Sequence, residues 1–174
     1  NVLGARLVFV LQPGNAAAGV AVAPAVQVAV VDGNGNTLAS DAREVTVSLG
    51  ANPGTATLSG TLVVAASNGV AVFSDIRLDR PGAGYTLIAS ATDVVSATSG
   101  TFDVAPGAAA QLVFLVQPVN TQAVAAITPA VQVALEDALG NRATGDTRSV
   151  TLALGSNPGG STLSGTLAVA ASGG

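Results

Sequence analysis

Short stretches of the chain alternate between hydrophobic and polar residues. In residues 25–32 and 44–49, every second residue is Val or Leu. Successive side chains of a β-strand point to opposite faces, so a period of two predicts strands with one buried face. No stretch shows the 3.6-residue period of an amphipathic helix. The pattern therefore predicts an all-β protein.

Turn signals rich in Gly, Pro, Asn and Asp divide the first part of the chain into short predicted strands. These strands are residues 6–12, 25–32, 44–49, 57–59, 61–66, 70–78 with a kink near Ser74 and Asp75, 85–92 and 98–104. Residues 80–84 are predicted to form a turn. Such spacing is typical of an antiparallel β-sandwich. Its expected core comprises Phe9, Val26, Val28, Val30, Val45, Val47, Phe73, Leu87 and Phe102, with Gln27 and Thr46 facing outward.

The chain contains a long internal repeat. Residues 5–69 recur without a gap at residues 110–174, and more than half of the aligned pairs are identical. A period of this length is too long for a solenoid repeat and suits a self-contained domain. We expect a complete domain in residues 1–105, a short linker in residues 105–109 that contains Pro106, and a second domain in residues 110–174.

The second repeat lacks counterparts of residues 70–104. Without them, residues 110–174 are expected to leave apolar sheet faces and strand edges uncovered and to be unstable as a free domain. Two explanations are open: the chain is a segment of a longer array, or a neighbouring molecule completes the sandwich by adding strands. The second explanation predicts a filament linked by intermolecular β-pairing.

Several absent residue types narrow the range of functions. The chain has no Cys, His, Lys, Met or Trp. Disulfides and thiolate metal sites are therefore excluded, and no Ser or Thr can be activated by a neighbouring His or Lys. We expect a protein that is not an enzyme and that carries no catalytic or cofactor-binding residues.

Charge and hydropathy also disfavour two kinds of partner. The net charge is −4, and the six Arg residues are scattered, which argues against nucleic acid. Residues 7–31 and 104–135 carry no charge and are long enough for membrane helices. However, prolines interrupt both segments at the same positions of the repeat, so we expect no membrane span.

One loop has the composition of a metal site. Asp32, Asn34 and Asn36 hold the first, third and fifth positions of a Gly-punctuated loop, as in the start of a calcium loop. The alternative is a hairpin turn in which Asp and Asn bond their own backbone. The equivalents in the second repeat are Asp137, Leu139 and Asn141. Because the middle oxygen ligand is lost there, the sequence favours a turn, and these three residues remain a weak calcium candidate.

Two further groups of charged residues have no predicted chemistry. Glu136 and Asp137 are adjacent, so in a strand they point to opposite faces, and we expect a solvated edge. A second group, Asp75, Arg77, Asp79 and Arg80, is expected to form a surface patch of ion pairs that adds little stability.

Three motifs in the first repeat, in this order and spacing, resemble bacterial immunoglobulin-like domains. They are Val-Gln-Val-Ala-Val-Val-Asp at residues 26–32 running into Gly35-Asn36, Gly-Val-Ala-Val-Phe at residues 69–73, and Gly-Tyr-Thr-Leu at residues 84–87. The similar domains are the tandem repeats of large cell-surface proteins, a group that includes invasin and intimin. Tyr85 is similar to the tyrosine corner of sandwich folds. The buried Trp and paired Cys of antibody domains are absent.

The resemblance implies antiparallel immunoglobulin-like β-sandwich domains in tandem, outside a bacterial cell or on its surface. The expected function is a non-enzymatic stalk, adhesin or filament building block. Its expected partners are neighbouring repeats or other copies of the protein, through strand pairing. The alternative function is a carbohydrate- or protein-binding module, since sandwiches often bind through loops at one end.

Overall fold

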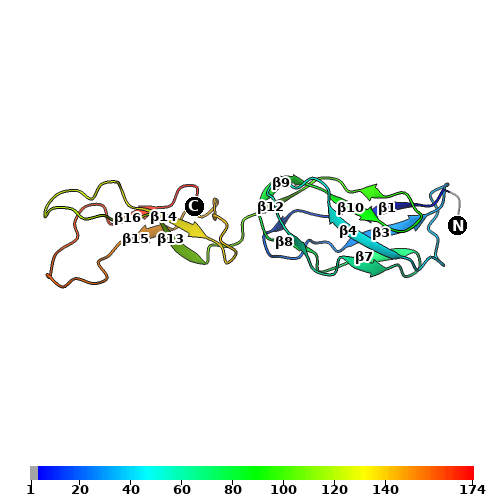
Figure 1. Ribbon diagram of the computed structural model, residues 1–174, viewed down its shortest axis with the longest axis horizontal. Coiled ribbons are helices and arrows are strands. Elements are labelled where there is room, and N and C mark those ends of the chain that lie inside the picture. The colour runs from blue at the N-terminus through cyan, green and yellow to red at the C-terminus, as the bar shows by residue number, and fades with distance from the viewer. Residues whose placement is uncertain (1–3) are drawn as a thin grey trace. The chain divides into compact units, whose positions relative to one another are not determined.

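The computed structural model describes residues 4–174, and none of these residues lies in a helix (Figure 1). The all-β prediction is therefore confirmed. Consistent with this, the described part of the chain contains no apolar helix long enough to cross a membrane. The chain divides into two compact units, Asn1–Ala105 and Pro106–Gly174, called unit 1 and unit 2 below.

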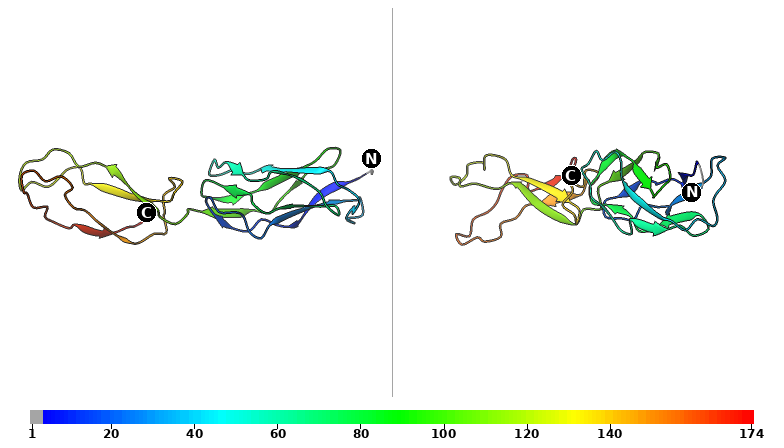
Figure 2. Two further views of the ribbon diagram at one scale, coloured as in Figure 1. Left: turned by 90° about the horizontal axis from the view of Figure 1, so that it is seen from below. Right: turned by 45° about the vertical axis from the view of Figure 1, so that its right-hand side comes forward.

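Residues 4–105 of unit 1 contain twelve strands. Figure 2 shows the ribbon in two further views. They are β1 (Arg6–Leu11), β2 (Ala16–Ala17), β3 (Val26–Val31), β4 (Glu44–Leu49), β5 (Leu58–Ser59), β6 (Val63–Ala65), β7 (Val70–Phe73), β8 (Arg77–Leu78), β9 (Gly82–Tyr85), β10 (Leu87–Ser90), β11 (Ala97–Thr98) and β12 (Phe102–Ala105). The larger sheets run in the order β1-β3-β7 and β11-β10-β4-β6. Two smaller sheets have the orders β2-β12-β9 and β5-β8.

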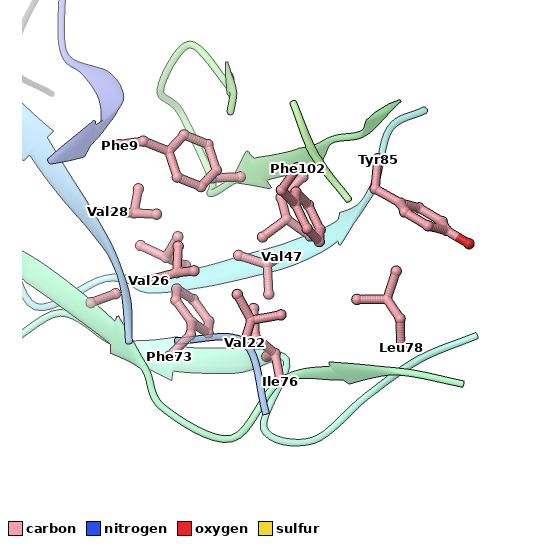
Figure 3. Close-up of a cluster of buried hydrophobic side chains, with 14 of the residues drawn as sticks. Phe9, Val22, Val26, Val28, Val47, Phe73, Ile76, Leu78, Tyr85 and Phe102 are labelled. Atoms are coloured by element: carbon pink, nitrogen blue, oxygen red, sulfur yellow. The ribbon is translucent and has the colours of Figure 1, made fainter. Parts of the chain in front are cut away.

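The buried faces of these sheets contribute to one hydrophobic cluster (Figure 3). β3 pairs with β1 and β7 in a register that places Val28 opposite both Phe9 and Ala71. β4 supplies Val45 and Val47 to the same cluster. All nine predicted core residues are buried, which confirms that list, and β4 alternates as predicted. In β3 the alternation is incomplete, because Ala29 and Val31 are buried as well. Their polar neighbours Gln27 and Thr46 are half-buried, because both strands have a partner on each side.

The structure differs from the predicted elements where strands are very short. The predicted kink near Ser74 and Asp75 is confirmed, since β7 ends at Phe73 and β8 begins at Arg77. The predicted turn at residues 80–84 is wrong in its second half: Gly82–Tyr85 forms β9, which pairs with β12. The strands β2 and β11 have two residues each, which is too few to show an alternation of hydrophobic and polar residues.

The side chain of Tyr85 makes several contacts within unit 1. Its hydroxyl donates to the Arg80 carbonyl at 2.9 Å, and its ring lies 5.9 Å from that of Phe102. Burial raises the pKa of the Tyr85 phenol. A Cβ atom on Gly54 would collide with this hydroxyl and with the Pro81 carbonyl. Gly54 is therefore a position where only glycine lets the backbone approach the tyrosine.

Unit 2 contains the strands β13 (Gln111–Val116), β14 (Gln132–Glu136), β15 (Ser149–Thr151) and β16 (Ala168–Ala170). The β13–β14 pair reproduces the β1–β3 register, with Phe114 opposite Val133 and a bulge at the same place. The β15–β16 pair reproduces the β4–β6 register. Each pair forms a two-stranded sheet. That the sheets of the two units are immunoglobulin-like sandwiches in tandem remains a prediction.

Candidate functional site

The loop predicted as a possible calcium site is organised around the carboxylate of Asp32. The Asp32 Oδ1 atom accepts the backbone amides of Asn34 and Asn36, both at 2.9 Å. The Asp32 Oδ2 atom accepts the side-chain amide of Asn36 at 3.2 Å. Gly35 has a φ of 91°, the left-handed conformation that such a turn requires. The structure thus brings the three candidate residues together, with N–H donors directed at the carboxylate.

The second repeat contains the same turn with a further donor. The Asp137 Oδ1 atom accepts the amides of Leu139 and Asn141 at 2.9 Å. Its Oδ2 atom accepts the side chain of Asn141 at 3.0 Å and the amide of Gly107 at 2.9 Å. Asp137 is 2% exposed, so the expected solvated edge at Glu136 and Asp137 is wrong for Asp137. Its neighbour Glu136 is half-buried.

Hydrogen bonds lower the pKa values of both carboxyl groups. The backbone and side-chain amides of Asn36 lower the pKa of Asp32. Burial raises the pKa of Asp137, but the donors of Asn141, Gly107 and Leu139 outweigh burial, and the pKa is lowered. Among residues 4–174, no group of three acidic, His or Cys residues is placed to hold a metal ion. The hydrogen bonds to these two carboxylates therefore stabilise the turns.

We expect the melting temperature of the chain to fall as the pH drops below about 5. The lowered pKa values mean that the folded carboxylates bind protons less readily than the unfolded ones. Their stabilisation is therefore fully present above the unfolded pKa and is lost as the pH falls through the folded value. Circular dichroism melts from pH 7 to pH 2.5 measure this change. The variant Asp32→Asn, in unit 1, should melt lower at pH 7 and lose less on acidification; an unchanged pH dependence would contradict the role of Asp32.

Two members of the predicted ion-pair patch, Asp75 and Asp79, also accept hydrogen bonds. The Asp75 carboxylate accepts the amide and the hydroxyl of Thr61 at 2.9 and 3.0 Å, and Asp79 accepts the amide of Thr57 at 2.6 Å. These bonds fasten residues 57–61 to the segment that contains β8. Salt bridges are also found at the repeated Asp-x-Arg pairs Arg43–Asp41 and Arg148–Asp146.

The most unusual surface of the chain is the open apolar face of unit 2. Leu112 and Phe114 are 56% and 46% exposed, whereas their equivalents Leu7 and Phe9 are 3% and 8% exposed. A groove on unit 2 is lined mainly by aliphatic residues of four strands and their flanks, among them Leu115, Val131, Val133, Val150, Leu152, Leu167 and Val169. In unit 1 the equivalent residues are covered by other strands, so this face of unit 2 is exposed apolar surface that a monomeric protein rarely presents.

No family model matches the chain, and no curated protein is similar to it.

Proposed function

We propose that the chain is a non-enzymatic structural or adhesive repeat of an extracellular bacterial surface or fibre protein. In this role it serves as a stalk or filament building block whose partners are neighbouring repeats or other copies. The single observation that carries the proposal is how the two ends of unit 1 are joined. β2, near the N-terminus, pairs in parallel with β12, at the end of the unit, through Val104↔Ala16 and Ala105↔Ala17.

Hydrogen bonds outside the ladder reinforce this junction. The amide of Ala18 donates to the Ala105 carbonyl at 2.8 Å. The side chains of Gln12 and Asn15 accept the amides of Gly100 and Asp103 at 2.9 and 2.8 Å, across 88 residues of sequence. Together these bonds connect the N-terminal part of the unit to its last strand.

This topology resists force. When the ends of unit 1 are pulled apart, parallel strands near the two ends are drawn in opposite directions along their length. The bonds between them are then loaded together in shear, rather than broken one at a time. Such resistance is what a stalk or fibre requires. The alternative function as a sugar-binding module receives less support, because four of the five aromatic residues, Phe9, Phe73, Tyr85 and Phe102, are buried, and Phe114 is the one that is exposed.

We expect single-molecule pulling on the full chain to show an unfolding step for unit 1 whose gain in contour length is roughly 350 Å less the end-to-end distance of the folded unit, because about 100 residues at about 3.5 Å each become extended. The double variant Gln12→Ala, Asn15→Ala should unfold at clearly lower force, since it removes two ties to the last strand. The matched control is Gln117→Ala, Asn120→Ala, the same change in the second repeat. Equal unfolding forces for unit 1 in all three chains would contradict a mechanical role.

A further inference from the structure

We propose that unit 2 is an acceptor for one β-segment, and that this segment has the residue pattern of residues 70–104. The inference is independent of the mechanical role proposed above. Unit 1 and unit 2 share their sequence over residues 5–69 and 110–174, and unit 1 shows which strands cover the equivalent face. β7 pairs with β3 there, and β10 pairs with β4. The corresponding edges of β14 and β15 have no strand beside them.

The open edge of β14 presents the backbone amides with which a β7-like strand would pair. In unit 1 the amide of Val30 donates to the Gly69 carbonyl at 2.9 Å, where β7 begins. Alternate residues of an antiparallel strand face the same edge, so Val28 and Val26 also direct their amides toward β7. Their counterparts Val133 and Val131 therefore direct amides toward the open edge. An edge with exposed amides beside apolar side chains binds extended polypeptide by strand addition.

Three glycines of unit 2 match the path of such a segment, although the φ of 107° at Gly165 favours glycine by itself. In unit 1, a Cβ atom on Gly54 would meet the Pro81 carbonyl, and one on Gly60 would meet the Asp75 carbonyl. One on Gly50 would meet the side chains of Thr86 and Ile88. All of these obstacles belong to residues 70–104. The equivalents in unit 2 are Gly155, Gly159 and Gly165, and around each the corresponding space is open.

The repeated glycines are informative because the local backbone of unit 2 does not need all of them. Gly159 has no atom nearer to a Cβ position than the Ser161 hydroxyl at 3.8 Å, and its φ lies outside the left-handed region. Alanine would fit this position in unit 2 as it stands. Glycine is required only when a backbone passes close by, as residues 80–82 pass Gly54 in unit 1.

Two polar side chains also favour a segment like residues 70–104 as the occupant. Gln12 and Asn15 accept backbone amides of residues 100 and 103, inside the covering segment of unit 1. Their counterparts Gln117 and Asn120 are retained and exposed. The apolar face, the strand edges, the glycines and these acceptors thus all match one ligand.

A second copy of the chain does not satisfy these requirements. Its residues 70–104 are already folded within its own unit 1, where Phe73 and Tyr85 are fully buried. If the open faces of unit 2 from two copies packed together, they would cover apolar area. Such a dimer would not explain why glycine is retained at the three positions. The occupant is therefore a segment that is not already part of a complete unit.

The test adds a peptide of residues 69–105 to the full chain and measures binding by calorimetry and amide exchange. We expect one peptide per chain, protection of the amides of Val131 and Val133, and no change in unit 1. Gly159→Ala should weaken binding about tenfold or more, because the new methyl group meets the peptide backbone. The matched control Gly145→Ala, which lies in open space and replaces no glycine of unit 1, should bind normally. A peptide with Ala71→Pro should not bind, since it lacks the amide that faces β14.

A chain extended after Gly174 by residues 70–105 gives a second measurement that does not depend on peptide solubility. It should gain a second cooperative unfolding transition, and Gly159→Ala should lower the midpoint of that transition. The proposal is overturned if the peptide does not bind and the extended chain gains no transition. It is also overturned if Gly159→Ala has no effect in either measurement, or if the chain dimerises through unit 2 and the peptide cannot displace the second copy.

Discussion

Replacing Phe73 by alanine is expected to lower the free energy of unfolding of unit 1 by about 3–5 kcal/mol. Phe73 is fully buried at the end of β7, opposite Val26 of β3. Truncation removes the apolar contacts of the ring and leaves a cavity in a core made mostly of small side chains. Domains of this size have a total stability of only about 5–15 kcal/mol, so the loss is a large share of it.

Urea unfolding followed by tyrosine fluorescence measures this effect without interference from unit 2, because Tyr85 is the only Tyr and the chain has no Trp. The control is Val72→Ala, one residue away on the same strand, where the side chain is 45% exposed. That change should cost less than about 0.5 kcal/mol beyond the small loss of β-propensity. Similar losses for the two variants would contradict the register of β7.

The strands that could be predicted from the sequence are those with a side-chain alternation of their own. β4 begins and ends where it was predicted, and β1 and β3 do so within one residue, because burial of one face produces a period of two. β9 was missed because Gly82 and Gly84 resemble a turn, although the strand forms through pairing with β12. β2 consists of two Ala residues whose parallel partner lies far away in sequence. Long-range pairing, rather than local pattern, defines these elements.

The site residues also fall into two groups, those whose partners are close in sequence and those whose partners are distant. The turn around Asp32 could be predicted because its donors lie within four residues. The roles of Gln12, Asn15 and Gly54 could not, because their partners lie far along the chain. The repeat contained a usable signal for these roles. Gln117, Asn120 and Gly159 are retained in unit 2, where the space around Gly159 is open.

The largest expected contrast lies between equivalent amides of the two units. Val28 and Val133 occupy the same position of the repeat and the same register with the preceding strand. β3 has a strand on each side, whereas β14 has a strand on one side only. We expect the amide of Val28 to exchange with solvent at least about a thousandfold more slowly than that of Val133, since its exchange requires opening of the packed core.

Hydrogen exchange followed by NMR on the full chain measures both amides under one condition. Ala29 and Ala134 provide the internal control, because both face the preceding strand and both are fully buried, so their difference should be smaller. In the chain extended by residues 70–105, the exchange of Val133 should slow toward that of Val28. Equal protection of Val28 and Val133 in the chain of 174 residues would show that unit 2 is stable without a covering segment. Slow exchange of Val133 only after extension would show that the missing stability comes from strands of the 70–104 pattern, since nothing else in unit 2 has changed.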